Sequence, residues 1–154
     1  MEDLLRVEKI EAFIMPTRAI PVIVCYLEDN RQFVLYSVPP EVVASINKIQ
    51  GVGDYAEFFS NGRENIFDIL PLISEVKNSI SDHLERVVID ELSQETGLFS
   101  ASVELKFDGV LIQKKMIPSH AIYLALVSER PVFVKRELVD EQEKEREGEE
   151  HSNP

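Results

Sequence analysis

The sequence contains one cysteine, no tryptophan and no apolar run long enough to cross a membrane. A single thiol, Cys25, excludes an intramolecular disulfide. Its apolar surroundings at residues 20–27 favour a small buried side chain over a catalytic thiol. The first residues also lack the basic and apolar pattern of a signal peptide. These absences lead us to expect a soluble, cytoplasmic protein with no membrane partner.

Basic residues are scarce: the chain has 16 lysines and arginines but 28 aspartates and glutamates, which gives a net charge of −12. The excess of acid is spread over the chain, because residues 1–135 carry 20 acids against 13 bases. A broad basic face normally supplies most of the affinity for nucleic acid. The charge therefore disfavours nucleic acid as a partner, although a local basic patch or a metal that bridges carboxylates to phosphate remains open.

The length of 154 residues and the hydrophobic content of 44% fit one domain with a substantial core. Apolar alternation, helical periodicity and proline or glycine boundaries divide the chain into strands and helices. The Asp108-Gly109 pair is a strong signal for a hairpin turn. We predict an α+β fold, with a mostly antiparallel sheet and packed helices. The expected strands are 6–15, 20–28, 32–38, 84–92, 98–107, 110–116 and 131–135, and the expected helices are 41–50, 65–79 with a break at Pro71, and 118–129.

The order of these elements suggests a weak internal duplication, βββαα followed by βββαβ. Val38 and Ile117 take equivalent places, 79 residues apart, each at the end of a strand and before a proline that opens a helix. Residues 136–154 are acidic and nearly free of apolar side chains, so they either extend a helix or stay disordered. We assign residues 1–138 to the domain and expect residues 139–154 to form a flexible acidic tail.

Two helix starts carry polar residues that suit chemistry on anions. Ser119 and His120 follow Pro118, where unpaired backbone N–H groups and the helix dipole favour negative charge. Asn65 is a plausible N-cap, with Asp68 three residues later. Each residue also has an ordinary interpretation: His120 as a surface residue at a helix start, and Asp68 as an acid that complements the dipole.

The segment Ile117-Pro-Ser-His-Ala-Ile-Tyr-Leu-Ala, followed by Arg130-Pro-Val-Phe-Val, resembles the helix start and following strand of the bifunctional nuclease domain family. Glu41 with Ala44, and the segment from Arg63 to Leu70, add further similarity. The resemblance covers about residues 5–140. It implies an α+β domain, a homodimer, and DNase and RNase activity.

Carried over by position, the resemblance implies that Glu41, Asp68 and His120 are catalytic and that Arg63 and Ser119 bind substrate. Metal-assisted phosphodiester hydrolysis would use a divalent ion such as Mg²⁺ or Mn²⁺, and His120 also suits Zn²⁺. Four positions depart from the family's pattern, and they remove a metal ligand, a phosphate clamp and a base. These positions are Val38 for glycine, Phe67 for histidine, Ile117 for arginine and His120 for aspartate.

Two hypotheses about function follow. The first is a nuclease with weak activity on DNA or RNA, supported by the retained Glu41, Asp68 and Ser119. The second is a non-catalytic dimeric binding or scaffold domain, favoured by the acidic body and the four departures. Glu41 and Arg63 have ordinary interpretations too, as a first-turn acid and a solvated loop residue. Lys114, Lys115 and Arg130, the basic residues nearest the signature helix, are either surface residues or a phosphate-facing patch.

Overall fold

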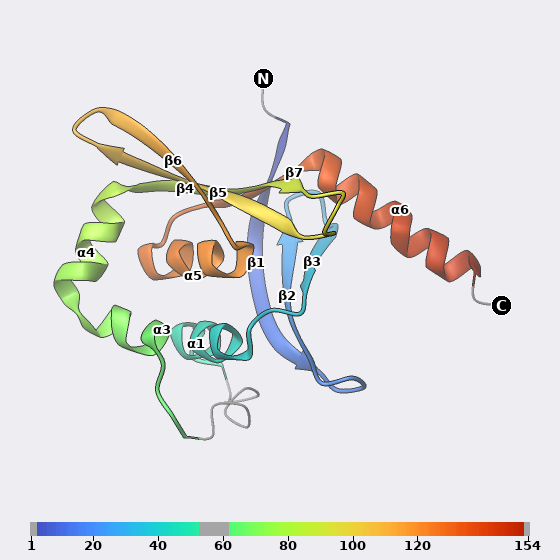
Figure 1. Cartoon of the computed structure of the whole chain (residues 1–154), viewed down its shortest axis with the longest axis horizontal. Helices are drawn as coiled ribbons and strands as arrows, with labels where there is room; N and C mark the ends of the chain where they lie inside the picture. Colours follow the sequence, from blue (N-terminus) through green and yellow to red (C-terminus); the bar gives the residue numbers. More distant parts are fainter. Residues whose placement is uncertain (1–2, 53–61, 153–154) are drawn as a thin grey trace.

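A computed structural model describes residues 3–52 and 62–152 (Figure 1). Seven strands form one sheet in the order β3-β2-β1-β7-β4-β5-β6, and the predicted α+β class is confirmed. The strands are β1 (Leu4–Met15), β2 (Ile20–Leu27), β3 (Gln32–Tyr36), β4 (Leu84–Leu92), β5 (Phe99–Phe107), β6 (Val110–Met116) and β7 (Val132–Lys135). The helices are α1 (Pro40–Gln50), α3 (Ile66–Ile69), the 3₁₀ turn η1 (Leu70–Leu72), α4 (Ser74–His83), α5 (Pro118–Ser128) and α6 (Arg136–Ser152).

Neighbouring strands are antiparallel, except that β7 runs parallel to β4. The sheet curls, because Phe33 of β3 contacts Phe99 of β5 edge to face at 5.0 Å although four strands lie between them in the sheet. β1 pairs with β7 only through Leu4–Arg6 and then leaves it, while its other edge stays paired with β2. This divergence opens space beside the middle of β1.

Helices α1 and α5 pack against each other beside β1 (Figure 1). Each bears a buried apolar face, formed in α1 by Val42, Val43 and Ile46, and these faces join the inner residues of the sheet in one core. Burial of this apolar surface is the main source of the fold's stability.

The two helices are built alike, as the expected duplication requires. Pro40 and Pro118 each start an 11-residue helix, where the missing N–H costs nothing. Gly51 and Glu129 each end one in the left-handed conformation, with φ of 69° and 55°. The helix starts are 78 residues apart, so the predicted match of Val38 to Ile117 was one residue out of register. The second proline of the Pro39-Pro40 pair, not the first, opens the helix.

The helix expected over residues 65–79 is interrupted where the sequence indicated. Pro71 lacks an N–H group, and the chain forms a 3₁₀ turn over Leu70–Leu72. Ile73 is extended, and α4 then continues to His83, beyond the predicted end. The Asp108-Gly109 hairpin is confirmed, with φ of 47° and 83° at the two turn residues.

The C-terminal segment is helical, which is one of the two forms that its composition left open. Residues 136–152 form α6, in which Leu138 and Val139 are buried. The Gln142 amide donates to the Val34 carbonyl and accepts from the Val34 N–H, both at 2.8 Å, so the side chain pairs with the edge of β3. Arg31 also forms ion pairs with Asp140 and Glu143 of α6. The start of the predicted tail is therefore anchored to the domain.

Across the described ranges, no helix is both long enough and apolar enough to span a membrane.

Candidate functional site

The first turn of α3 lies between α1 and α5 and is fixed by a capping box. The Asn65 side chain accepts from the N–H groups of Phe67 at 2.8 Å and Asp68 at 3.3 Å. In return, the Asp68 carboxylate accepts from the Asn65 N–H at 3.0 Å. This reciprocal arrangement satisfies donors that a short helix would otherwise leave unpaired. It holds Phe67 and Asp68 in a defined orientation.

The Asp68 carboxylate is nearly buried and fully engaged. Its side chain is 5% exposed, and Oδ1 accepts from the Ser45 hydroxyl at 2.9 Å and lies 3.2 Å from the Lys48 ammonium. Burial would raise the pKa of Asp68, but the hydrogen bonds from Asn65, Ser45 and Lys48 outweigh it and lower the pKa. Asp68 is therefore a stable carboxylate that orients Lys48.

Phe67 connects this carboxylate to α5. Its ring meets Tyr123 at 5.0 Å and His120 at 5.1 Å, and its carbonyl accepts from the Tyr123 hydroxyl. Burial, followed by the charge of Asp68, raises the pKa of Tyr123 to about 12. Phe67 thus serves as an apolar support for His120.

The N-terminus of α5 has no side-chain cap. Ile117 stands at the N-cap position, where it offers no acceptor to the N–H groups of Ser119 and His120. The Ser119 hydroxyl is buried without a partner among the described residues, and the His120 side chain is partly exposed. An uncapped helix start of this kind attracts anions through its free N–H groups and its dipole.

The predicted site residues are brought together only in part. Asp68 and His120 flank Phe67, and Ser119 precedes His120 on α5. Glu41 lies in the first turn of α1, one turn before Ser45, and its exposed carboxylate forms no hydrogen bond or ion pair with the described residues. Arg63 is exposed in the segment that leads into α3. The roles of all five residues remain predictions.

The geometry does not suit a divalent cation. No group of three carboxylate, imidazole or thiol side chains that could hold a metal occurs in the parts of the chain that the structure describes. The two oxygens of Asp68 already accept N–H and O–H groups, and the Lys48 ammonium at 3.2 Å would repel a cation. We therefore assign no step to a metal at Asp68.

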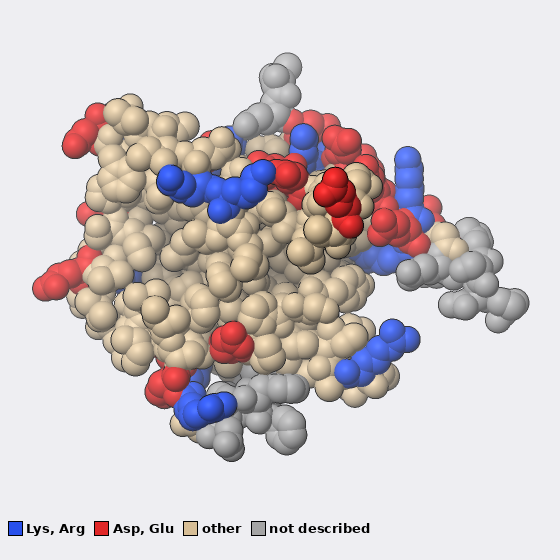
Figure 2. Space-filling model, viewed as in Figure 1, with Lys and Arg blue, Asp and Glu red and all other residues tan. Residues whose placement is uncertain are grey.

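The surface around Asp68, Phe67 and His120 is not broadly basic. On the face in Figure 2, basic side chains form one short band and a few smaller patches, and uncharged residues cover much of the surface over α4 and α5. Of the predicted basic group, Lys115 pairs with Glu91, and Arg130 donates to the Ser81 carbonyl at 2.6 Å. A long nucleic acid would therefore meet few cations on this face.

The sequence did not point to three residues that contact Asp68 or Phe67, namely Ser45, Lys48 and Tyr123. A signal for two of them was available, because residues 41, 45 and 48 follow helical spacing and therefore share one side of α1. Tyr123 follows Ser119 at the same spacing on α5. The contact of both helices with α3 joins residues that are distant in sequence, and periodicity alone cannot reveal it.

The fold is an α+β domain in which a curled, mostly antiparallel sheet packs against two similar helices. A sequence model of the Bifunctional nuclease domain matches residues 69–147, slightly more than half of the chain. The chain belongs to the bifunctional nuclease domain family. The matched span contains Ser119 and His120 but begins after Asp68. A search of curated proteins found no match.

Proposed function

We propose that this protein is a slow nuclease, which hydrolyses phosphodiester bonds at the N-terminus of α5. The observation that carries the proposal is the uncapped start of α5, with the partly exposed His120 beside it and the Lys48–Asp68 pair across Phe67. Membership of the bifunctional nuclease domain family supports a nuclease-related role. The helix start supplies an anion site, and the imidazole supplies a group for proton transfer.

In this mechanism, the free N–H groups of Ser119 and His120 bind the non-bridging oxygens of one phosphate. The His120 imidazole acts as the general base and accepts a proton from the attacking water. The water oxygen bonds to phosphorus, the ester bond breaks, and solvent protonates the leaving oxygen. Lys48, oriented by Asp68, adds positive charge near the developing negative charge.

Three features make the activity slow. Ile117 stands where the family has an arginine, so the helix start lacks one charged phosphate contact. The Asp68 carboxylate is occupied by three donors and does not itself activate water. The net charge of −12 repels nucleic acid at a distance. We expect short oligonucleotides to be better substrates than long duplexes.

The test is hydrolysis of end-labelled single- and double-stranded DNA and RNA, with a chelator or with Mg²⁺, Mn²⁺ or Zn²⁺. The Lys48→Gln variant should lose about tenfold in rate, because it removes one charge from the transition state. Lys106→Gln, an exposed position at the end of β5, is the matched control and should keep the rate. Equal losses in the two variants would contradict the assignment of Lys48.

A second candidate function is a non-catalytic dimeric scaffold. A specific observation favours it: apolar side chains are exposed together on α3, η1 and the start of α4. Soluble monomers rarely expose large contiguous apolar patches. We propose that a second copy of the chain covers this surface, whether or not the protein is catalytic. The residues are Ile66 at 64%, Ile69 at 44%, Leu72 at 76% and Ile73 at 41% exposure.

Analytical ultracentrifugation tests the dimer. The wild type should sediment as a dimer at micromolar concentration, and Leu72→Glu should weaken association at least tenfold, because it places a charge in the contact. Leu98→Glu is the control, since Leu98 is 67% exposed outside this surface. A monomeric wild type would refute the dimer. A dimer without hydrolysis of any substrate would favour the scaffold over the nuclease.

A further inference from the structure

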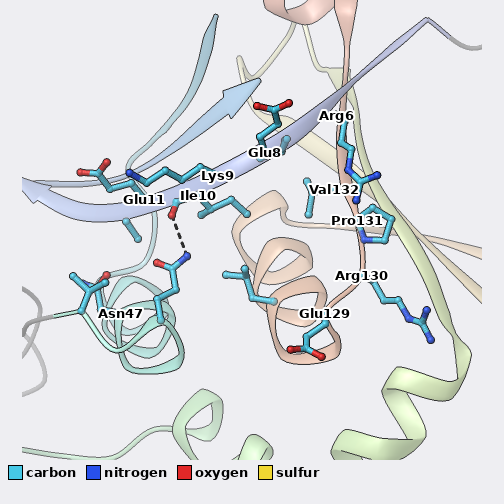
Figure 3. Close-up of a pocket in the computed structure, with 15 residues that line it drawn as sticks. Arg6, Glu8, Lys9, Ile10, Glu11, Asn47, Glu129, Arg130, Pro131 and Val132 are labelled. Carbon is cyan, nitrogen blue, oxygen red and sulfur yellow. Dashed lines mark hydrogen bonds between the residues drawn. The ribbon is translucent and has the colours of Figure 1, made fainter. Parts of the chain in front are cut away.

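The sheet has two outer edges, β3 and β6, and β1 opens a further edge where it leaves β7 after Arg6. β6 carries Lys114 and Lys115. The open part of β1 borders a pocket of about 830 Å³, in which the Gln50 amide donates to the Ile10 carbonyl at 3.0 Å (Figure 3). A bare strand edge pairs readily with a strand of another chain, and lysines or covering side chains oppose that pairing. These two edges therefore have protection of their own.

β3 itself carries none of the usual protection. Its five residues, Gln32-Phe-Val-Leu-Tyr36, include no charge and no proline, and its register with β2 continues without a bulge. Its three central side chains are apolar and buried. Short uncharged segments of this composition are the ones that pair edge to edge between chains. The protection of this edge must therefore come from another part of the chain.

Two side chains of α6 take the place of a neighbouring strand. The Gln142 amide pairs with both the N–H and the carbonyl of Val34 at 2.8 Å, and the Arg146 guanidinium donates to the Gln32 carbonyl at 3.0 Å. Arg146 also donates to the Gln142 side-chain oxygen at 2.7 Å, which joins the two contacts. Gln32 and Val34 are two residues apart, so their backbone groups point to the same side of β3. A further antiparallel strand would use these same groups.

α6 is buried only near its start. Leu138 and Val139 belong to the core, whereas the residues that follow are mostly polar or charged. Arg31 pairs with Asp140 and Glu143, but both acidic side chains are 48% exposed. Exposed ion pairs contribute about 0–1 kcal/mol each. The rest of α6 therefore depends largely on its contacts with β3, and it can be displaced while the start of the helix stays in place.

We propose that α6 is a removable cover of the β3 edge, and that β3 of a second copy pairs with this edge when the cover is displaced. An antiparallel pair centred on Val34 sets Gln32 opposite the partner's Tyr36, so only uncharged side chains face each other. The contact is the same on both copies, as a twofold dimer requires. It involves neither the α5 helix start nor the apolar surface on α3, so this inference goes beyond the proposed function and does not depend on it.

The experiment compares two variants of the full chain, each with two glycines in α6. Both are made in the Leu72→Glu background, which removes the α3 contact proposed above. Gln142→Gly/Arg146→Gly loses the bonds to β3, whereas Lys144→Gly/Glu145→Gly changes two exposed residues and keeps them. The second variant is therefore the matched control for the cost of glycine in a helix.

Analytical ultracentrifugation measures association, and hydrogen exchange at the Val34 amide reports on the edge itself. Gln142→Gly/Arg146→Gly should raise the dimer association constant at least about tenfold over the background and the control. Its Val34 amide should exchange faster at low protein concentration and slow down again as the dimer forms. Cooperative thermal unfolding checks that the variant is folded, as expected because Leu138 and Val139 are unchanged.

Lysines on the edge test where the copies meet. Gln32→Lys/Tyr36→Lys, added to Gln142→Gly/Arg146→Gly, should abolish the dimer, because it sets like charges opposite each other. A dimer that survives these lysines would place the contact elsewhere and overturn the proposal. A folded glycine variant that exchanges faster at Val34 but stays monomeric would overturn pairing between copies. Unchanged exchange at Val34 would show that α6 does not cover the edge.

Discussion

The two sides of α1 carry polar side chains in opposite states. Toward α3, Ser45 and Lys48 meet Asp68 in a network in which each polar group has a partner. Toward β1, Asn47 is more deeply buried than Lys48 and has none among the described residues. Burial alone thus does not show whether a polar side chain has a hydrogen-bond partner. The hydrogen-bond inventory does, and substitutions on the two sides should change stability in opposite directions.

The largest expected effect is at Asp68. Asp68→Ala should lower the free energy of unfolding by about 2–4 kcal/mol, because it removes the capping box of α3 and the charged hydrogen bonds of a buried carboxylate. Chemical denaturation measures the change. Asp82→Ala, at an exposed position of α4, is the control and should cost less than about 0.5 kcal/mol. Equal effects would show that the network does not stabilise the fold.

The same network predicts a dependence on pH. The pKa of Asp68 is lower in the folded protein than the value of about 3.9 for an unfolded chain. Its contribution is therefore present above about pH 4 and is lost as the pH falls through the folded pKa. Stability measured from pH 6 down to pH 2 should fall less steeply in Asp68→Asn than in the wild type. Parallel curves would contradict the assigned pKa shift.

The next effect compares two buried amides. Gln142→Leu should destabilise the protein by about 1–3 kcal/mol, because it leaves the N–H and C=O groups of Val34 unpaired at the edge of β3. Thermal and chemical unfolding report this loss. Glu145→Leu, an exposed position on the same helix, controls for the added apolar side chain. A neutral Gln142→Leu would mean that α6 contributes little to the domain.

The smallest effect has the opposite sign. Asn47→Leu should raise the free energy of unfolding by about 1 kcal/mol, because it replaces two unpaired polar atoms with an apolar group of similar size. Differential scanning calorimetry should show a higher Tm. A clear loss of stability would imply that Asn47 has a partner, such as ordered water, and would weaken the contrast between the two sides of α1.

Much of the fold could be predicted from local patterns. The strand at 84–92 and the Asp108-Gly109 hairpin follow from alternation and turn chemistry, and the helix starts follow from proline. Alternation in β5 separates apolar from polar side chains but does not predict burial, since Ser102 and Glu104 on the polar side are also buried. Ser102 donates to Asp90, and Glu104 pairs with Arg86, so their burial depends on the neighbouring strand β4.

What could not be predicted depends on contacts between distant parts of the chain. Gln142 anchors α6 through Val34, 108 residues away, so composition alone suggested a free tail. The partners of Asp68 on α1 lie 20 and 23 residues away, and the cap at Asn65 was the visible part of that network. The divergence of β1 from β7 after Arg6 also depends on strand pairing, for which the sequence offers no local signal.

The proposed function rests most directly on His120. Single-turnover hydrolysis of a labelled RNA oligonucleotide should be compared in the wild type and in His120→Ala at neutral pH. We predict a loss of about 100-fold, which is typical for removal of a general base, while thermal unfolding shows the variant to be folded. A folded His120→Ala variant that hydrolyses the RNA at the wild-type rate would contradict the placement of the reaction at the start of α5.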